Sequence, residues 1–227
     1  FYKKGYNTME RENVWLKYGE AEQRELTELG EAYRQYLSAA KTERECVREA
    51  VKLARKAGYR SLREVMDAGE KLAPGDRVYA DCMGKALALF QIGEEPLEMG
   101  MNLLGAHIDS PRLDLKQNPL YEDTEQALLD THYYGGIKKY QWVALPLALH
   151  GVVAKKDGTS VDVVIGEADS DPVVGISDLL AHLSGEQMEK KARLVIEGED
   201  LNVLVGSRPA KTEEEDKKEL VKKTILS

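Results

Sequence analysis

The chain contains a nearly continuous apolar run, Met101–Ala106, which is followed by a histidine and, two residues later, by an aspartate. Such a run, without the alternation of a half-exposed strand, is typical of an interior strand that is covered on both faces. Ligands bind at the carboxyl ends of strands in α/β sheets. In an extended chain His107 and Asp109 would share one face, because side chains alternate with a period of two. The run therefore predicts a buried strand with a polar site at its end.

The segment before this run is predicted to begin with helices. Residues 20–41 place apolar side chains on one side and charges on the other, which indicates an amphipathic helix. Thr42 and Glu45 form the pattern of a capping box, so a second helix is expected to begin there. Gly58 is a typical helix stop, and Ser61 repeats the capping signal for a short third helix.

Strands are predicted to follow these helices. Residues 78–83 and 85–92 have the composition of two strands with a glycine between them, and they lead into the apolar run. Helices followed by strands that enter a buried strand suggest a layered α/β domain.

The pattern changes after Pro111. Residues 116–131 are polar, and we expect them to be irregular. Beyond them, 143–155 and 161–166 are rich in β-forming residues, and the Lys-Asp-Gly-Thr sequence between them predicts a hairpin turn. Together with two further strand candidates, this predicts a small, mostly β module over 116–206. The further candidates are 193–196 and 201–205.

Composition excludes several classes of protein. The net charge of -8 argues against general nucleic-acid binding, which needs a basic face. No apolar run approaches about 18 residues, so no membrane span is expected, and the first residues do not resemble a signal peptide. Cys46 and Cys82 form no metal-binding spacing, and we expect them to be small buried side chains in a reducing compartment, which favours a cytoplasmic protein.

A histidine followed two residues later by an aspartate can place an imidazole on a metal ion with a carboxylate beside it. Such a pair also arises by chance in a chain with 4 histidines and 40 acidic residues. The alternative is structural: His107 closes a strand and Asp109 caps the turn that follows. The surrounding sequence is needed to choose between these interpretations.

Three segments resemble those of one known family. Residues 102–116, with His-Ile-Asp-Ser-Pro, resemble the first metal motif of the aspartyl aminopeptidase (aminopeptidase I) family. Residues 132–142 are similar to its Tyr-Gly-Gly segment, and 176–183 to a further segment. The order and approximate spacing are those of the family, over about 76–206, and the similarity is greatest to bacterial members.

The resemblance implies an α/β fold, with a partial zinc-peptidase α/β/α domain and an inserted β-rich dimerisation domain. Residues 1–115 would be the N-terminal part of the catalytic domain, and 116–206 the dimerisation domain. Residues 207–227 would be a charged linker or helix that leads to the second half of the catalytic domain. Within it, ten of the thirteen residues from Lys211 to Lys223 are charged, which favours a solvated helix capped by Thr212.

The same resemblance implies a site with two divalent metal ions, usually zinc, with cobalt or manganese as alternatives. His107 would be a metal ligand and Asp109 the adjacent catalytic carboxylate. His182 is a candidate substrate-binding residue, with a structural role as the alternative. Asp178 stands where eukaryotic members have the histidine that reaches the neighbouring subunit. The family's remaining ligands and general base would lie beyond residue 227, so we expect the 227-residue chain to be inactive by itself.

These implications leave three functions to compare. The first is a metalloaminopeptidase that removes N-terminal residues from peptides and forms dimers that build a large closed homo-oligomer. The second is a non-catalytic fragment or assembly module that dimerises but binds no metal. The third is a related glutamyl aminopeptidase or endoglucanase-like metallopeptidase, against which the Tyr-Gly-Gly and His182 segments argue.

Overall fold

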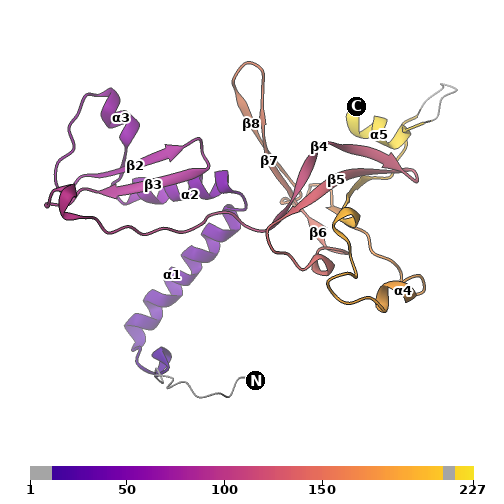
Figure 1. Ribbon diagram of the computed structural model, residues 1–227, viewed down its shortest axis with the longest axis horizontal. Coiled ribbons are helices and arrows are strands. Elements are labelled where there is room, and N and C mark those ends of the chain that lie inside the picture. The colour runs from indigo at the N-terminus through magenta and orange to yellow at the C-terminus, as the bar shows by residue number, and fades with distance from the viewer. Residues whose placement is uncertain (1–11, 212–217) are drawn as a thin grey trace. The chain divides into compact units, whose positions relative to one another are not determined.

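A computed structural model describes residues 12–211 and 218–227. The chain divides into two compact units, Phe1–Ala106 and His107–Ser227 (Figure 1). Within the described ranges, no helix is both long enough and apolar enough to cross a membrane.

Three α-helices in the first unit confirm the predicted helical segment. α1 and α2 match the expected positions, and Gly58, at φ +85°, follows the end of α2. The capping box is present, because Thr42 Oγ1 accepts from the Glu45 amide and Glu45 Oε2 accepts from the Thr42 amide. Ser61 precedes α3, but its side chain makes no capping hydrogen bond. The helices are α1 (Glu20–Ala39), α2 (Glu43–Lys56) and α3 (Leu62–Asp67), with the 3-10 helices η1 (Val14–Leu16) and η2 (Leu97–Met99).

A small sheet completes the first unit, with α2 packed against it (Figure 1). Its strand order is β1-β2-β3, with β1 parallel to β2 and β2 antiparallel to β3. The two predicted strands are therefore confirmed. Buried side chains of α2 and β2, including Val47 and Val78, form the core. Cys46 is buried as predicted, but Cys82, the last residue of the central strand β2, is exposed. The strands are β1 (Arg60–Ser61), β2 (Arg77–Cys82) and β3 (Ala86–Gln91).

The predicted interior strand at 101–106 is wrong for this structure. Residues 100–111 have no regular secondary structure, and Leu104 is 97% exposed. A strand needs a neighbour that accepts and donates its backbone hydrogen bonds, and no strand among the described residues pairs with this segment. The apolar side chains therefore lie in contact with solvent.

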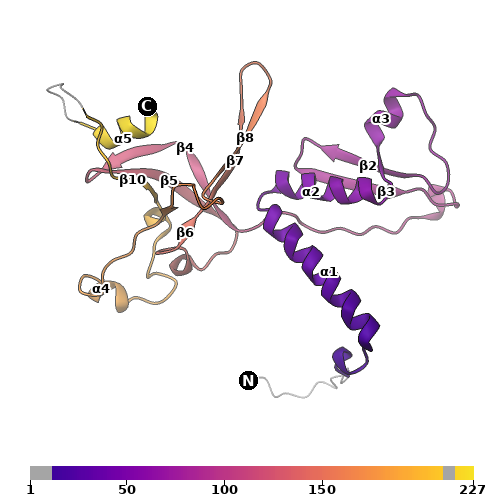
Figure 2. The ribbon, with the colours of Figure 1, turned by 180° about the vertical axis from the view of Figure 1, so that it is seen from behind.

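The second unit is built on a five-stranded sheet of order β4-β5-β10-β9-β6, in which every pairing is antiparallel (Figure 2). The prediction that 116–131 is irregular is wrong, because this stretch forms most of a long hairpin. A register shift between Leu115 and Leu120 accommodates Pro119, which cannot donate a backbone hydrogen bond. The strands are β4 (Arg112–Asp123), β5 (Gln126–Tyr134), β6 (Pro146–Leu147), β9 (Val174–Gly175) and β10 (Val203–Gly206).

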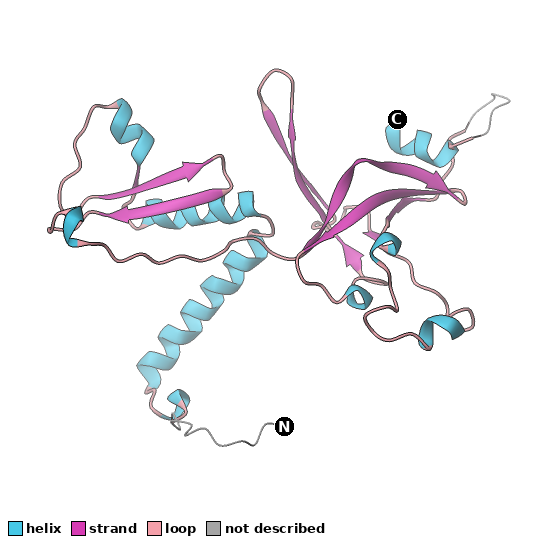
Figure 3. Ribbon diagram, viewed as in Figure 1, coloured by secondary structure: helices cyan, strands magenta, loops and turns pink. Residues whose placement is uncertain are grey.

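The hairpin predicted around residues 156–159 is confirmed. β7 (Leu149–Ala154) pairs antiparallel with β8 (Ser160–Ile165) over six residue pairs (Figure 3). Asp157 accepts hydrogen bonds from the amide and the hydroxyl of Thr159, which closes the turn between the strands.

The core of the second unit includes side chains of the five-stranded sheet itself. It contains Val174, Ile176, Ile196, Leu201 and Val203, all buried. Thr131 on β5 donates its hydroxyl to the carbonyl of Leu201, which ties the sheet to the segment before β10.

Two further predictions in this unit need correction. Residues 193–196 form turns rather than a strand, although Ile196 is buried in the core. A C-terminal helix exists, but α5 (Leu220–Leu226) begins later than predicted and buries Val221. The proposed cap Thr212 and the acidic residues that follow it lie outside the described residues. A single helical turn, α4 (Gly185–Met188), and two 3-10 turns, η3 (Lys139–Gln141) and η4 (Gly198–Asp200), complete the unit.

The boundary between the two compact units follows Ala106, nine residues before the end of the predicted catalytic segment 1–115. The assignment of 1–115 to a catalytic domain, of 116–206 to a dimerisation domain and of 207–227 to a linker stays a prediction.

The fully buried Leu201 gives a test of the second core. Leu201→Ala should lower the free energy of unfolding by about 2–5 kcal/mol, because it leaves a cavity among the core side chains. Leu180→Ala is the control: this side chain is 70% exposed, and its loss should change stability by less than about 0.5 kcal/mol. Chemical denaturation measures both, and equal effects would contradict this placement of the core.

Candidate metal centre

His107 and Asp109 lie at the beginning of the second unit, in the irregular segment just before β4. Nδ1 of His107 is 3.2 Å from Oδ1 of Asp109 and 3.2 Å from the Asp109 backbone oxygen. The His107 side chain is 86% exposed and that of Asp109 is 38% exposed. The structure thus brings together the two predicted site residues, with the imidazole accessible to a ligand.

A third side chain joins this pair from a distant part of the sequence. Tyr134, the last residue of β5, donates its hydroxyl to Oδ2 of Asp109 at 2.9 Å. This hydrogen bond is the main reason that the pKa of Asp109 is lowered from its ordinary value, followed by the residue's own backbone amide. His107 makes a smaller contribution in the same direction. The carboxylate is therefore held in its charged form, in which it can accept from two sides.

Tyr134 belongs to the Tyr-Gly-Gly segment, and no role was predicted for it from the sequence. The contact could not be found from spacing, because Tyr134 is 25 residues away from Asp109. The pairing of β4 with β5 creates it, and residues 116–131 were expected to be irregular. An alternation of apolar side chains at Leu113 and Leu115 was the available signal for β4.

The types of ligand in this pair suit zinc, which takes imidazole nitrogen and carboxylate oxygen. The number of ligands does not complete a zinc site, because catalytic zinc normally has three protein ligands. Within residues 12–211 and 218–227, no group of three or more His, Cys, Asp or Glu side chains is placed to hold a metal ion. His107 and Asp109 fit one part of a metal site.

His182 is not joined to this pair. It lies in an exposed stretch without regular secondary structure, and among the described residues no hydrogen bond or ion pair connects it to His107 or Asp109. The neighbouring Asp178 accepts hydrogen bonds from the Leu179 amide and from Gln187, so its role is local. The structure thus places His182 on the surface, without a partner in the candidate centre.

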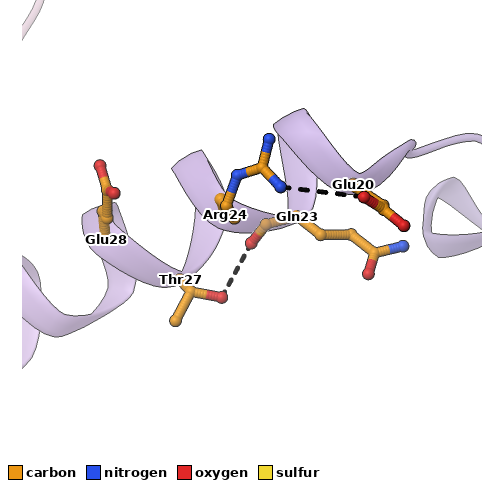
Figure 4. A pocket seen from close by; sticks show the side chains of 5 residues that line it. All are labelled: Glu20, Gln23, Arg24, Thr27 and Glu28. Atoms are coloured by element: carbon orange, nitrogen blue, oxygen red, sulfur yellow. Dashed lines mark hydrogen bonds and ion pairs between the residues drawn. The ribbon is translucent and has the colours of Figure 1, made fainter.

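A shallow surface pocket lies elsewhere, along α1 (Figure 4). One exposed face of a single helix forms it, with an ion pair between Arg24 and Glu20 and a hydrogen bond from Thr27 to the Gln23 carbonyl. None of the predicted site residues lines it. The lining side chains are Glu20, Gln23, Arg24, Thr27 and Glu28.

The contact between Tyr134 and Asp109 makes a pH-dependent prediction. Tyr134→Phe should raise the pKa of Asp109, because the hydroxyl stabilises the charged form in the folded state. A lowered folded-state pKa contributes stability above the unfolded pKa, and this stability is lost as the pH falls through the folded value. The destabilisation by Tyr134→Phe should therefore be larger at neutral than at acidic pH.

An NMR titration of the Asp109 carboxyl carbon measures this pKa. Tyr133→Phe is the matched control, because it removes a hydroxyl from the adjacent residue and leaves the hydrogen bond to Asp109 in place. An Asp109 pKa that both variants leave unchanged would contradict the hydrogen bond.

Comparison with known proteins identifies relatives over almost the whole chain. A probable M18 family aminopeptidase 1 of Clostridium acetobutylicum is 59% identical over 217 residues, which are 96% of this chain and 46% of the relative. The crystal structure of an M18 family aminopeptidase from Thermotoga maritima has a TM-score of 0.84 at 42% identity, again over 96% of this chain and 46% of that one. The chain thus spans about half the length of the curated relatives that it matches.

A more distant structure shares the fold. The mApe1 dodecamer of Saccharomyces cerevisiae is 19% identical, with a TM-score of 0.57 over 82% of this chain and 39% of that one. The sequence profile of one family, described as aminopeptidase I zinc metalloprotease (M18), matches residues 36–227. On this match and on the identity to the Clostridium relative, the chain belongs to the aminopeptidase I (M18) family of zinc metalloproteases.

Proposed function

We propose that this chain is part of a metal-dependent aminopeptidase, to which it contributes His107 as a metal ligand and Asp109 as the carboxylate that orients it. The observation that carries the proposal is the 3.2 Å contact between Nδ1 of His107 and Oδ1 of Asp109. With its proton on Nδ1, the imidazole donates to the carboxylate, and the lone pair of Nε2 is left for a cation. Histidines that bind metal ions are commonly held in this way.

The metal chemistry follows from the family. When bound, zinc polarises a peptide carbonyl and lowers the pKa of a bound water. We propose two ions in the complete site, with cobalt or manganese as workable substitutes. The residues of this chain orient the imidazole of His107. They do so through the charged Asp109, which accepts from His107 on one oxygen and from Tyr134 on the other.

The substrate in this proposal is a peptide that loses its N-terminal residue. The further metal ligands and a general base would come from the part of the relatives that this chain does not span, since it matches 46% of the Clostridium protein. The described residues do not gather three metal-binding side chains. We therefore propose that the 227-residue chain has no peptidase activity by itself.

We also propose that the protein is a homo-oligomer built through residues 116–206. One face of the β7–β8 hairpin is apolar throughout, and Val153 and Val161 on it are 54% and 43% exposed. Exposed apolar surface of this kind is suited to contact with another chain. The dodecameric state of the yeast protein with the same fold is consistent with such an assembly.

Two smaller proposals accompany this function. His182 is a candidate substrate-binding residue, and its exposed side chain is free to meet a substrate or another subunit. The protein is proposed to act in the cytoplasm, which fits the fact that neither Cys46 nor Cys82 is part of a disulfide.

The proposed activity is tested with the full-length protein and aminoacyl chromogenic substrates. Activity should be lost on treatment with a chelator and restored by zinc, cobalt or manganese. His107→Ala should lower kcat/KM by at least about 100-fold, because it removes a metal ligand. His132→Ala is the control: His132 lies on β5, where its ring stacks on that of Tyr133, and its loss should leave kcat/KM nearly unchanged.

The isolated chain of 227 residues should show no activity in the same assay. Peptidase activity that survives exhaustive chelation, or equal losses in both variants, would contradict the proposed function.

A further inference from the structure

We infer that Tyr134 is a positioning residue for the aminopeptidase reaction, acting through Asp109 on the metal ligand His107. The inference rests on the proposed function, and it deepens the description of the same site. Its basis is a continuous chain of contacts: the Tyr134 hydroxyl donates to Oδ2 of Asp109 at 2.9 Å, and Oδ1 of the same carboxylate lies 3.2 Å from His107 Nδ1.

The β4–β5 hairpin positions the Tyr134 hydroxyl next to Asp109. Arg112 and Tyr134 are the terminal residue pair of the antiparallel ladder, at the end nearest to Asp109. Immediately beyond it, the chain turns at Gly135, which has φ +78°, and a Cβ there would lie 3.6 Å from the backbone of Pro111. The two segments therefore run close together at Pro111 and Arg112, within three residues of Asp109. The position of Tyr134 relative to Asp109 is fixed by backbone pairing as well as by its own hydrogen bond.

The tyrosine ring is also held from one side. The guanidinium carbon of Arg112 lies 4.2 Å from the centroid of the Tyr134 ring, within the range of a cation–π contact. Arg112 is fixed in turn, because its Nε donates to Oδ1 of Asp114 at 2.7 Å. Arg112 therefore restricts the orientation of the ring, and the hydroxyl at its end donates to the Asp109 carboxylate.

The adjacent Tyr133 does not make the same contact with Asp109. It follows His132 on β5, and its ring lies 5.9 Å from the Lys139 ammonium group. Successive side chains of a strand point to opposite faces, so Tyr133 is directed away from the face that carries Tyr134. Among the described residues, the hydroxyl that reaches Asp109 is that of Tyr134.

This arrangement matters because the orientation of a metal-bound imidazole depends on the carboxylate behind it, and that carboxylate needs its own anchor. If Tyr134 holds Oδ2, the Asp109 carboxylate cannot rotate freely, and Oδ1 stays directed at His107. If the hydroxyl is lost, His107 and Asp109 remain, but the imidazole is free to adopt other orientations. Tyr134 should therefore affect metal geometry and turnover more than substrate binding.

The test is Tyr134→Phe in the full-length protein, with Tyr133→Phe as the matched control. Tyr134→Phe should lower kcat by about 10- to 100-fold, with KM little changed, and should weaken zinc affinity by a similar factor. With cobalt in place of zinc, the visible absorption band of the bound ion should shift, because its ligand geometry changes. Tyr133→Phe should leave kcat, zinc affinity and the cobalt spectrum as in the unsubstituted protein.

A double-variant cycle shows whether Tyr134 acts through Asp109. If it does, adding Tyr134→Phe to Asp109→Asn should cause little further loss of kcat. Independent, multiplying losses would overturn the inference, as would a Tyr134→Phe protein that is merely less stable, with unchanged kcat, zinc affinity and cobalt spectrum. An unsubstituted protein without chelator-sensitive activity would instead overturn the proposed function, and the zinc affinity and cobalt spectrum would still test the role of Tyr134.

Discussion

The antiparallel pairing of β4 with β5 is the constraint on which the second unit and its candidate site depend. At one end of the ladder, the Arg112–Tyr134 pair brings a hydroxyl to Asp109. Farther along the same strand, Thr131 donates its hydroxyl to the carbonyl of the fully buried Leu201, and residues 127–129 of β5 pair with β10. The same hairpin therefore connects the apolar core to the polar pair before β4. His107 and Asp109 lie on an irregular segment, but their geometry is defined because the β4–β5 hairpin follows directly and supplies Tyr134.

Sequence could predict the features that depend on neighbouring residues. The capping box of Thr42 and Glu45 specifies the start of a helix within four residues, and α2 begins there. The turn at 156–159 joins two β-forming stretches, so a hairpin was expected there, although its first strand, β7, begins at Leu149 rather than at residue 143. The His-x-Asp pair is also local: its two side chains were expected to lie on one face, and the structure places His107 Nδ1 3.2 Å from Asp109 Oδ1. Three short segments were enough to predict the family from the sequence.

The features that sequence could not predict depend on contacts between distant residues. Residues 101–106 are apolar enough for an interior strand, but a strand requires a partner, and no described strand pairs with them. β4 was missed because its charged residues and Pro119 obscured a short apolar alternation, which becomes a strand through pairing with β5. Tyr134 was given no role, because 25 residues separate it from Asp109. In each case the deciding interaction was a non-local backbone pairing.

We propose that this chain carries part of a metal site, and that Asp109 and Tyr134 orient His107 before a metal ion binds. The most direct measurement is the metal content of the purified 227-residue chain, by elemental analysis after exposure to zinc and desalting. We expect almost no zinc to be retained, because His107 and Asp109 are fewer than the three protein ligands that a catalytic zinc normally requires. About two tightly held ions per chain would contradict it, since a dinuclear site would then be complete within these residues.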